Sequence, residues 1–115
     1  MQRDWDLIRQ ILLATEAEES NVKIGFEAID GCTEEAFRYN AALLNEAELI
    51  HAMILPRIQT TVVNSLTWEG HEFLDAIRND AAWCNIKTVA QEKSIALSFA
   101  AIKAIEQHLF NAKFD

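Results

Sequence analysis

The 115-residue chain has few of the residues that form cross-links, tight turns and phosphate-binding loops: two cysteines, three glycines and one proline. Cys32 and Cys84 are too few for the disulfide framework of a small secreted protein, and neither belongs to a Cys-x-x-Cys pair that suggests zinc. The glycines do not have the spacing of a phosphate-binding or dinucleotide-binding loop. We therefore expect free thiols in a reducing, cytoplasmic setting and no cofactor.

Long apolar runs are also missing. The N-terminus opens on a charged amphipathic pattern without the apolar core of a signal peptide, and residues 49–68, nearly uncharged, still include His51 and Arg57. Half of the residues are hydrophobic and 24% are charged, which is typical of a packed globule. The sequence therefore predicts one soluble domain, residues 1–115, that does not enter a membrane.

Basic residues are the third shortage. The chain has 10 Lys and Arg against 18 Asp and Glu, a formal net charge of −8. Phosphate binding requires a clustered positive field, so this charge balance disfavours non-specific binding of nucleic acid. The distribution is uneven, because residues 1–48 contain eleven acids and four bases, whereas residues 49–68 contain Arg57 and no acid.

The spacing of apolar residues predicts an α+β fold that is mostly helical. A first helix should begin after Asp4 and run to about Glu19, and alternation over residues 22–28 predicts a strand with one buried face. Thr33 should cap a second helix that ends near Glu48. Residues 49–55 and 61–68 flank a proline-bounded loop and predict a β-hairpin.

Further helices should follow the hairpin. Thr67 should cap one that extends through Ile77, and Asn79-Asp80 should separate it from the next. The last helix should follow Ser94 and is apolar over more than half of its circumference, which favours either packing within the chain or a homodimer. For the homodimer interface we select three residues of this helix, Ile102, Ile105 and Leu109.

No set of residues has the spacing of a catalytic or metal site. His71-Glu72 resembles the start of a metalloprotease motif, but Asp75 stands where that motif requires a second histidine. The apolar neighbours of Cys84 favour an unreactive thiol. The three tryptophans lie in or beside apolar patterns, so we expect core or subunit contacts and not base stacking. The sequence therefore predicts a protein that is not an enzyme and has no metal site.

Three segments resemble known proteins. Two of them are similar to segments of winged-helix proteins: LLNEAELI at residues 43–50 and LTWEGHEFL at 66–74. Together with RDWDLIRQILL at residues 3–13, they resemble a family of short, uncharacterised bacterial and prophage proteins that is described only as a domain of unknown function. The resemblance covers residues 3–13 and 33–83. Two positions depart from the pattern: Asn40 stands where a histidine is expected, and Glu48 replaces the glycine that usually ends the helix in the left-handed conformation.

The resemblance implies a winged helix-turn-helix-like core over about 4–78, with an N-terminal helix, a strand, a helix and a β-hairpin wing, and a C-terminal helical extension over about 81–113. Such a fold predicts a DNA-binding factor similar to transcription regulators, with the helix from Thr33 in the major groove of duplex DNA. The residues expected to contact DNA are Arg38 and Asn40 of that helix and Arg57, Gln59, Thr60 and Thr61 of the wing.

The acids in that helix favour a second hypothesis. Glu34, Glu35, Glu46 and Glu48 face one arginine, and such a surface should repel phosphate at physiological salt. The alternative is an acidic interaction module that binds a protein partner or imitates the charge of DNA. Fold similarity favours nucleic acid, whereas electrostatics favours a protein, and fold alone does not determine function.

Overall fold

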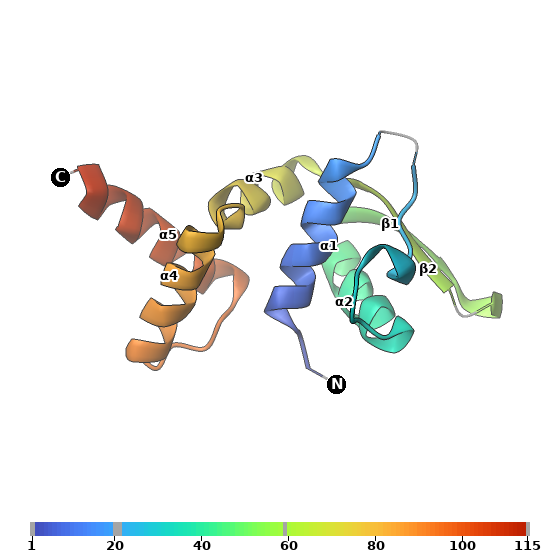
Figure 1. Ribbon diagram of the computed structural model, residues 1–115, viewed down its shortest axis with the longest axis horizontal. Helices are drawn as coiled ribbons and strands as arrows, with labels where there is room; N and C mark the ends of the chain where they lie inside the picture. The colour runs from blue at the N-terminus through green and yellow to red at the C-terminus, as the bar shows by residue number, and fades with distance from the viewer. Residues whose placement is uncertain (1, 20–21, 59, 115) are drawn as a thin grey trace. The chain divides into compact units, whose positions relative to one another are not determined.

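A computed structural model describes residues 2–19, 22–58 and 60–114 of the chain, with side chains up to residue 111. In these ranges it contains five α-helices and one two-stranded antiparallel sheet (Figure 1). The expectation of a mostly helical α+β protein is therefore confirmed. Contacts divide the chain into two compact units, residues 1–74 and residues 75–115. Each is considered separately below, as the N-terminal and the C-terminal unit.

Two helices of the N-terminal unit begin at the predicted caps. Helix α1 spans Trp5–Ala17, and a side-chain oxygen of Asp4 accepts from the Leu7 N–H at 3.1 Å. Helix α2 spans Glu34–Glu46, and the Thr33 hydroxyl oxygen accepts from the Ala36 N–H at 3.1 Å. Both helices end about two residues earlier than the apolar spacing suggested, and both bury one apolar stripe, as predicted.

The predicted hairpin follows α2. Strand β1, Ile50–Leu55, pairs antiparallel with β2, Thr60–Leu66, and a 3₁₀ turn at Pro56–Ile58 begins their connection. The register shifts between His51 and Ala52, and there the side-chain oxygen of Asn45 accepts from the Ala52 N–H at 3.1 Å. Asn45 of α2 thus satisfies a donor of β1 that would otherwise be open to another chain.

The predicted strand over residues 22–28 is wrong over most of its length. Ile24 alone pairs with Val63 of β2, through N–H···O bonds of 2.9 and 2.8 Å in the two directions. The chain then turns into a 3₁₀ helix, Phe26–Ala28, in which the Ala28 N–H donates to the Gly25 carbonyl at 3.2 Å. Because these turn bonds use the backbone donors after Gly25, the strand ladder does not continue.

The core of the N-terminal unit lies where α1 and α2 cover the hairpin (Figure 1). Helix α3, Trp68–Ile77, begins in this unit, and the ring of Phe73 lies 6.2 Å from that of Trp5 in α1. The fully buried side chains of this unit are apolar apart from one asparagine; the largest are Phe37, Phe73, Ile8, Ile11, Leu12, Ile50, Leu74, Val63 and Asn40. That asparagine is one of the predicted DNA contacts.

The C-terminal unit contains helix α4, Asp80–Glu92, which packs against helix α5, Phe99–Phe114. The predicted break at Asn79-Asp80 is confirmed, and Asn79 caps α4, its side-chain oxygen accepting from the Ala82 N–H at 3.0 Å. The expected start of the last helix after Ser94 is wrong. Ser94 adopts a φ of 55° just beyond α4, and Ser98 caps α5 by accepting from the Ala101 N–H at 3.1 Å.

The residues chosen for a homodimer lie mostly inside the chain. Ile102 and Ile105 of α5 are buried by the chain's own atoms, and Leu109 is half-buried. Two positions of the apolar face of α5 are therefore packed within the molecule, whereas Phe110 on the same helix is 52% exposed. None of the described helices is long and apolar enough to cross a membrane.

Candidate interaction site

Asn40 points into the molecule and not toward a ligand. Its side chain is 2% exposed, its amide oxygen accepts from the Asp4 N–H at 3.0 Å, and its amide nitrogen donates to the Ala36 carbonyl at 2.9 Å. These bonds join α2 to the residue that caps α1. Because the side chain is buried and each end of its amide bonds within the chain, Asn40 does not present its amide at the surface of α2.

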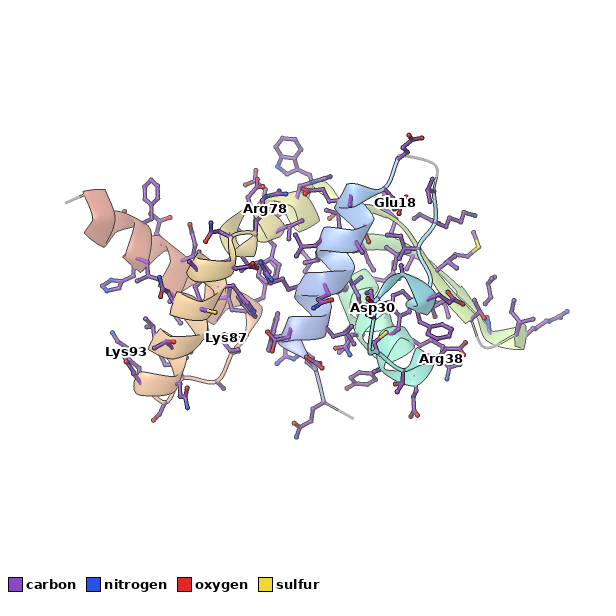
Figure 2. The ribbon with its side chains drawn as sticks, in the orientation of Figure 1. Glu18, Asp30, Arg38, Arg78, Lys87 and Lys93 are labelled. Atoms are coloured by element: carbon purple, nitrogen blue, oxygen red, sulfur yellow. The ribbon has the colours of Figure 1, made fainter. Side chains whose placement is uncertain are left out.

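The remaining predicted DNA contacts are only partly brought together. Arg57 is exposed on the 3₁₀ turn that follows β1, and Thr60, half-buried, opens β2. Thr61 is 6% exposed and faces the interior. Arg38 is half-buried on α2 (Figure 2), and Gln59 lies outside the described residues. The hairpin connection thus presents one arginine to solvent, and α2 adds a partly covered one.

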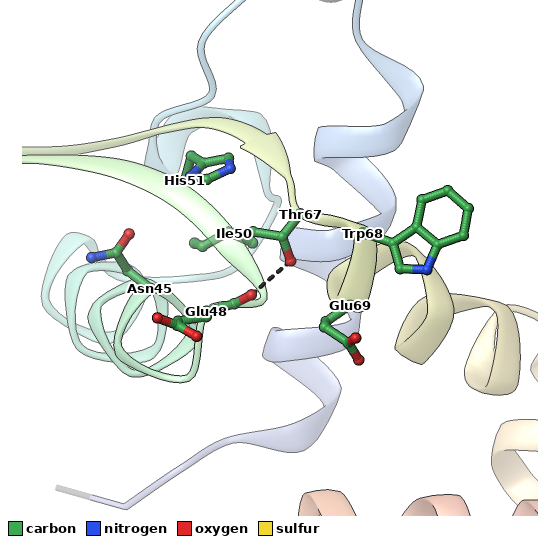
Figure 3. Close-up of a pocket in the computed structure, with 7 residues that line it drawn as sticks. All are labelled: Asn45, Glu48, Ile50, His51, Thr67, Trp68 and Glu69. Carbon is green, nitrogen blue, oxygen red and sulfur yellow. Dashed lines mark hydrogen bonds between the residues drawn. The ribbon is translucent and has the colours of Figure 1, made fainter.

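A groove lies on the N-terminal unit where the end of α2, the start of β1 and the start of α3 meet. Its volume is 440 Å³. Figure 3 shows Asn45 and Glu48 on one side of Thr67, with Trp68 and Glu69 on the other. The described residues that line it are Asn45, Glu48, Ile50, His51, Thr67, Trp68 and Glu69. None of them is a lysine or an arginine.

Thr67 holds the two sides of this groove together. Its hydroxyl donates to the Glu48 carbonyl at 2.6 Å (Figure 3) and accepts from the Gly70 N–H at 3.0 Å. The Thr67 N–H donates to the Leu49 carbonyl at 3.0 Å. The cap that the sequence predicted at Thr67 is therefore confirmed. The same hydroxyl also ties α3 to the end of α2, a contact that sequence spacing could not indicate.

Gly70 allows α3 to lie directly on the backbone beside Glu48. A Cβ atom at Gly70 would collide with the carbonyl oxygen of Leu49, which is main chain and cannot move aside as a flexible side chain would. Glu48 itself has a φ of 63°, the left-handed conformation that the sequence pattern associates with glycine. The groove is thus framed by backbone hydrogen bonds and close packing, with little freedom to change shape.

Trp68 is the exposed side chain of this junction. Its relative exposure is 78%, whereas Trp83 is buried and Trp5 half-buried, so the expected core or subunit contact is not made by Trp68 within the chain. The buried positions of α3 are Gly70, Phe73, Leu74 and Ile77. This stripe at helical spacing excludes position 68, and it is the signal that could have predicted an exposed tryptophan.

Acidic residues follow Trp68 along α3 and line the far side of the groove. Glu69 lies in the first turn of α3, and Glu72 is exposed one turn beyond Trp68, on the same side of the helix. Glu48 lines the groove from the end of α2. Carboxylates exposed to water at these positions attract a cation and repel phosphate.

The structure offers little support for metal or thiol chemistry. Within the described ranges, no group of three or more His, Cys, Asp or Glu side chains is placed to hold a metal ion. Burial raises the pKa of the Cys32 thiol, which donates a weak hydrogen bond of 3.6 Å to the Phe26 carbonyl. Cys84 is exposed on α4, so the apolar surroundings expected for it from its neighbours are wrong.

Two comparisons place the chain among proteins without an assigned activity. A family model described as "Hypothetical protein (DUF2513)" matches residues 2–96, which include the groove and both helices before it. An "Uncharacterized protein" of Haemophilus influenzae is 39% identical over 114 residues, covering 96% of this chain and 97% of its own length. No solved structure matches this chain.

Proposed function

The chain belongs to the DUF2513 family, and we propose that it is a non-enzymatic interaction module that binds a basic surface of a partner protein through residues 1–74. One observation supports this most strongly. Residues 1–74 contain thirteen acids and five bases, whereas residues 75–115 contain five of each, so the N-terminal unit accounts for the whole net charge of −8.

Individual residues of both units are labelled in Figure 2: Glu18, Asp30 and Arg38 in the N-terminal unit, and the bases Arg78, Lys87 and Lys93 in the C-terminal one. An acidic surface accelerates encounter with a basic partner and slows encounter with nucleic acid, and both effects weaken as salt rises. The electrostatics therefore favours a protein partner.

We also propose that the N-terminal unit has a winged-helix-like arrangement. The order of helix, extended pairing at Ile24, helix and hairpin supports it, with α2 packed against the hairpin. A helix that reads DNA presents polar groups to base edges and is preceded by a positioning helix. Here Asn40 is turned inward, and the described residues just before α2 form only the 3₁₀ turn Phe26–Ala28. This scaffold suits a protein ligand better than a major groove.

Binding of duplex DNA through the hairpin is the second candidate. Arg57 is exposed at the connection, and residues 49–68 contain no acid, so the hairpin is the least acidic part of the N-terminal unit. One exposed arginine provides a single phosphate contact, which gives weak affinity at physiological salt. This candidate is retained as the competing outcome of the following experiment.

The test is a pair of fluorescence-anisotropy titrations with the full chain. One probe is a labelled lysine-serine peptide and the other a labelled random duplex, each at low and moderate salt. We expect the peptide to bind, with an affinity that falls as salt rises, and the duplex not to bind. Glu35→Gln should weaken peptide binding, whereas Glu92→Gln, an equally exposed change in the C-terminal unit, should not.

The opposite result has a clear meaning. Duplex binding that weakens with salt and is lost in an Arg38→Ala/Arg57→Ala double variant would overturn the proposal and identify a DNA-binding protein. Failure of both probes at low salt would also overturn it, because a net charge of −8 should attract a basic peptide under those conditions.

A further inference from the structure

We propose that the groove beside Trp68 receives an arginine side chain of the partner protein, an inference that rests on the proposed function. The groove is defined by the lining residues given above, together with Glu72 on the next turn of α3. Its volume of 440 Å³ falls within the range of about 300–1,000 Å³ that is usual for ligand pockets. A single long side chain therefore fits.

The exposed indole provides a stacking face. Tryptophan is the best aromatic partner of a cation, and the planar guanidinium of arginine stacks on it, whereas a compact ammonium does not. An indole that is 78% exposed also has a large area to bury when a partner covers it. Tryptophan and arginine dominate the energetic centres of protein interfaces, which is consistent with this pairing.

The carboxylates complement the charge of the same group. Glu69 and Glu72 follow Trp68 within α3, and Glu48, at the end of α2, lines the groove on the other side of Thr67 (Figure 3). A guanidinium offers five N–H donors in a flat fork, so it can stack on the indole and still donate to a carboxylate at its edge. A phosphate or a nucleic-acid backbone in this groove would instead face three negative charges.

The frame of the groove is already formed. Thr67 bridges its two sides through the 2.6 Å bond to the Glu48 carbonyl and the 3.0 Å bond to the Leu49 carbonyl, and Gly70 packs on the same backbone. A ligand therefore needs to immobilise little more than exposed side chains on binding. Such preorganisation raises affinity because less ordering accompanies association.

The experiment compares two peptides of equal charge, one rich in arginine and the other with lysine at the same positions. General electrostatic attraction predicts equal affinities, whereas a stacking site predicts a preference for arginine. We expect the arginine peptide to bind about tenfold more tightly, and Trp68→Leu to remove that preference by weakening arginine binding more than lysine binding. Ile58→Ala, a change at another exposed apolar residue of the N-terminal unit, should leave both affinities unchanged.

Nuclear magnetic resonance supplies the second measurement. The three tryptophans give three indole N–H signals, and Trp68→Leu identifies the signal of Trp68 by its absence. We expect that signal to move during titration with the arginine peptide and those of Trp5 and Trp83 to remain in place. This observation separates direct contact at Trp68 from a loss of folding in the variant.

The remaining outcomes distinguish a failure of the arginine site from a failure of the proposed function. If both peptides bind equally and the Trp68 signal stays still, the arginine site is wrong and the acidic interaction module stands. If neither peptide binds, both are wrong. If the Trp68 signal instead moves with protein concentration alone and Arg57→Ala abolishes that movement, the occupant is a second copy of this chain, which overturns the assignment to a partner.

Discussion

Helices α2 and α4, one in each unit, end in the same way. Each is followed by a non-glycine residue in the left-handed conformation, Glu48 with a φ of 63° and Ser94 with a φ of 55°. The next N–H then reaches back five residues, from Leu49 to the Leu44 carbonyl at 2.9 Å and from Ile95 to the Ala90 carbonyl at 2.8 Å. Both are hydrogen-bonded helix endings of the Schellman type.

The surroundings of the two endings differ. After Glu48 the chain enters the hairpin and is bound by Thr67 and Gly70 at the start of α3, so the ending becomes one wall of a groove. After Ser94 it enters a loop before α5, and Ser94 itself is exposed. The same type of helix ending is thus part of a candidate site in the acidic N-terminal unit, and only reverses the chain direction in the C-terminal unit, whose net charge is zero. Tertiary packing, not the helix ending, makes the difference.

Adding a methyl group at Gly70 should have the largest effect on stability, because it disrupts the packing of α3 against the end of α2, which has no counterpart at the end of α4. Gly70→Ala forces a Cβ against the Leu49 carbonyl and should lower the free energy of unfolding by about 3 kcal/mol. Gly31→Ala is the control, with open space around it and a φ of 80°, and should cost about 1 kcal/mol. Urea denaturation followed by circular dichroism measures both.

Amide hydrogen exchange shows where the Gly70→Ala loss occurs. We expect faster exchange in α1, α2 and the hairpin, with α4 and α5 retaining their protection. Equal loss of protection in residues 75–115 would contradict the expectation that Gly70→Ala destabilises the N-terminal unit alone, because the two units would then unfold as one.

Substitution of two asparagines compares the stability contributed by tertiary hydrogen bonds with that contributed by a local helix cap. Asn40→Ala removes the bonds to Asp4 and Ala36 and leaves the Asp4 N–H without its acceptor, so it should lower stability by about 2 kcal/mol. Asn79→Ala removes only the cap of α4 and should cost about 1 kcal/mol. Thermal unfolding of the two variants provides the measurement. A near-neutral Asn40→Ala that loses binding to DNA would instead support the original DNA-contact hypothesis.

Substituting glycine at Glu48 and at Ser94 directly tests whether the two helix endings differ in function. Glu48→Gly and Ser94→Gly should each raise the free energy of unfolding by about 1 kcal/mol, because glycine adopts a positive φ without a steric penalty. Only Glu48→Gly should also weaken binding of the arginine peptide, since it removes a carboxylate from the groove. Loss of binding in Ser94→Gly would show that the groove is not where the peptide binds.

Salt should produce the smallest difference. Raising the salt concentration screens repulsion among the thirteen acids of residues 1–74 and should stabilise that unit by less than about 1 kcal/mol, with little change in the neutral unit. Hydrogen exchange of slowly exchanging amides at two salt concentrations measures the two units separately. An equal response in both would show that net charge does not distinguish their stabilities.

The sequence determined the elements whose signals are local. Apolar stripes at helical spacing predicted α1 and α2, and Asp4, Thr33 and Thr67 were each predicted as caps that the structure confirms. Asn79, predicted only as part of the break between two helices, also caps one of them. Each of these caps needs only a side chain and a backbone N–H three residues later. The family resemblance marked Glu48 as a position where glycine usually ends the helix, and net charge follows from composition alone.

Only the tertiary structure decided which face each residue presents. Asn40 was predicted as a base contact, yet it bonds to Asp4, 36 residues away along the chain, and the segment after Ile24 turns instead of extending the sheet. Trp68 is exposed and Ile102 is buried, although both are apolar residues in helices. Burial and groove formation depend on residues far apart in sequence, such as Gly70 against Leu49, and helical periodicity contains no information about these contacts.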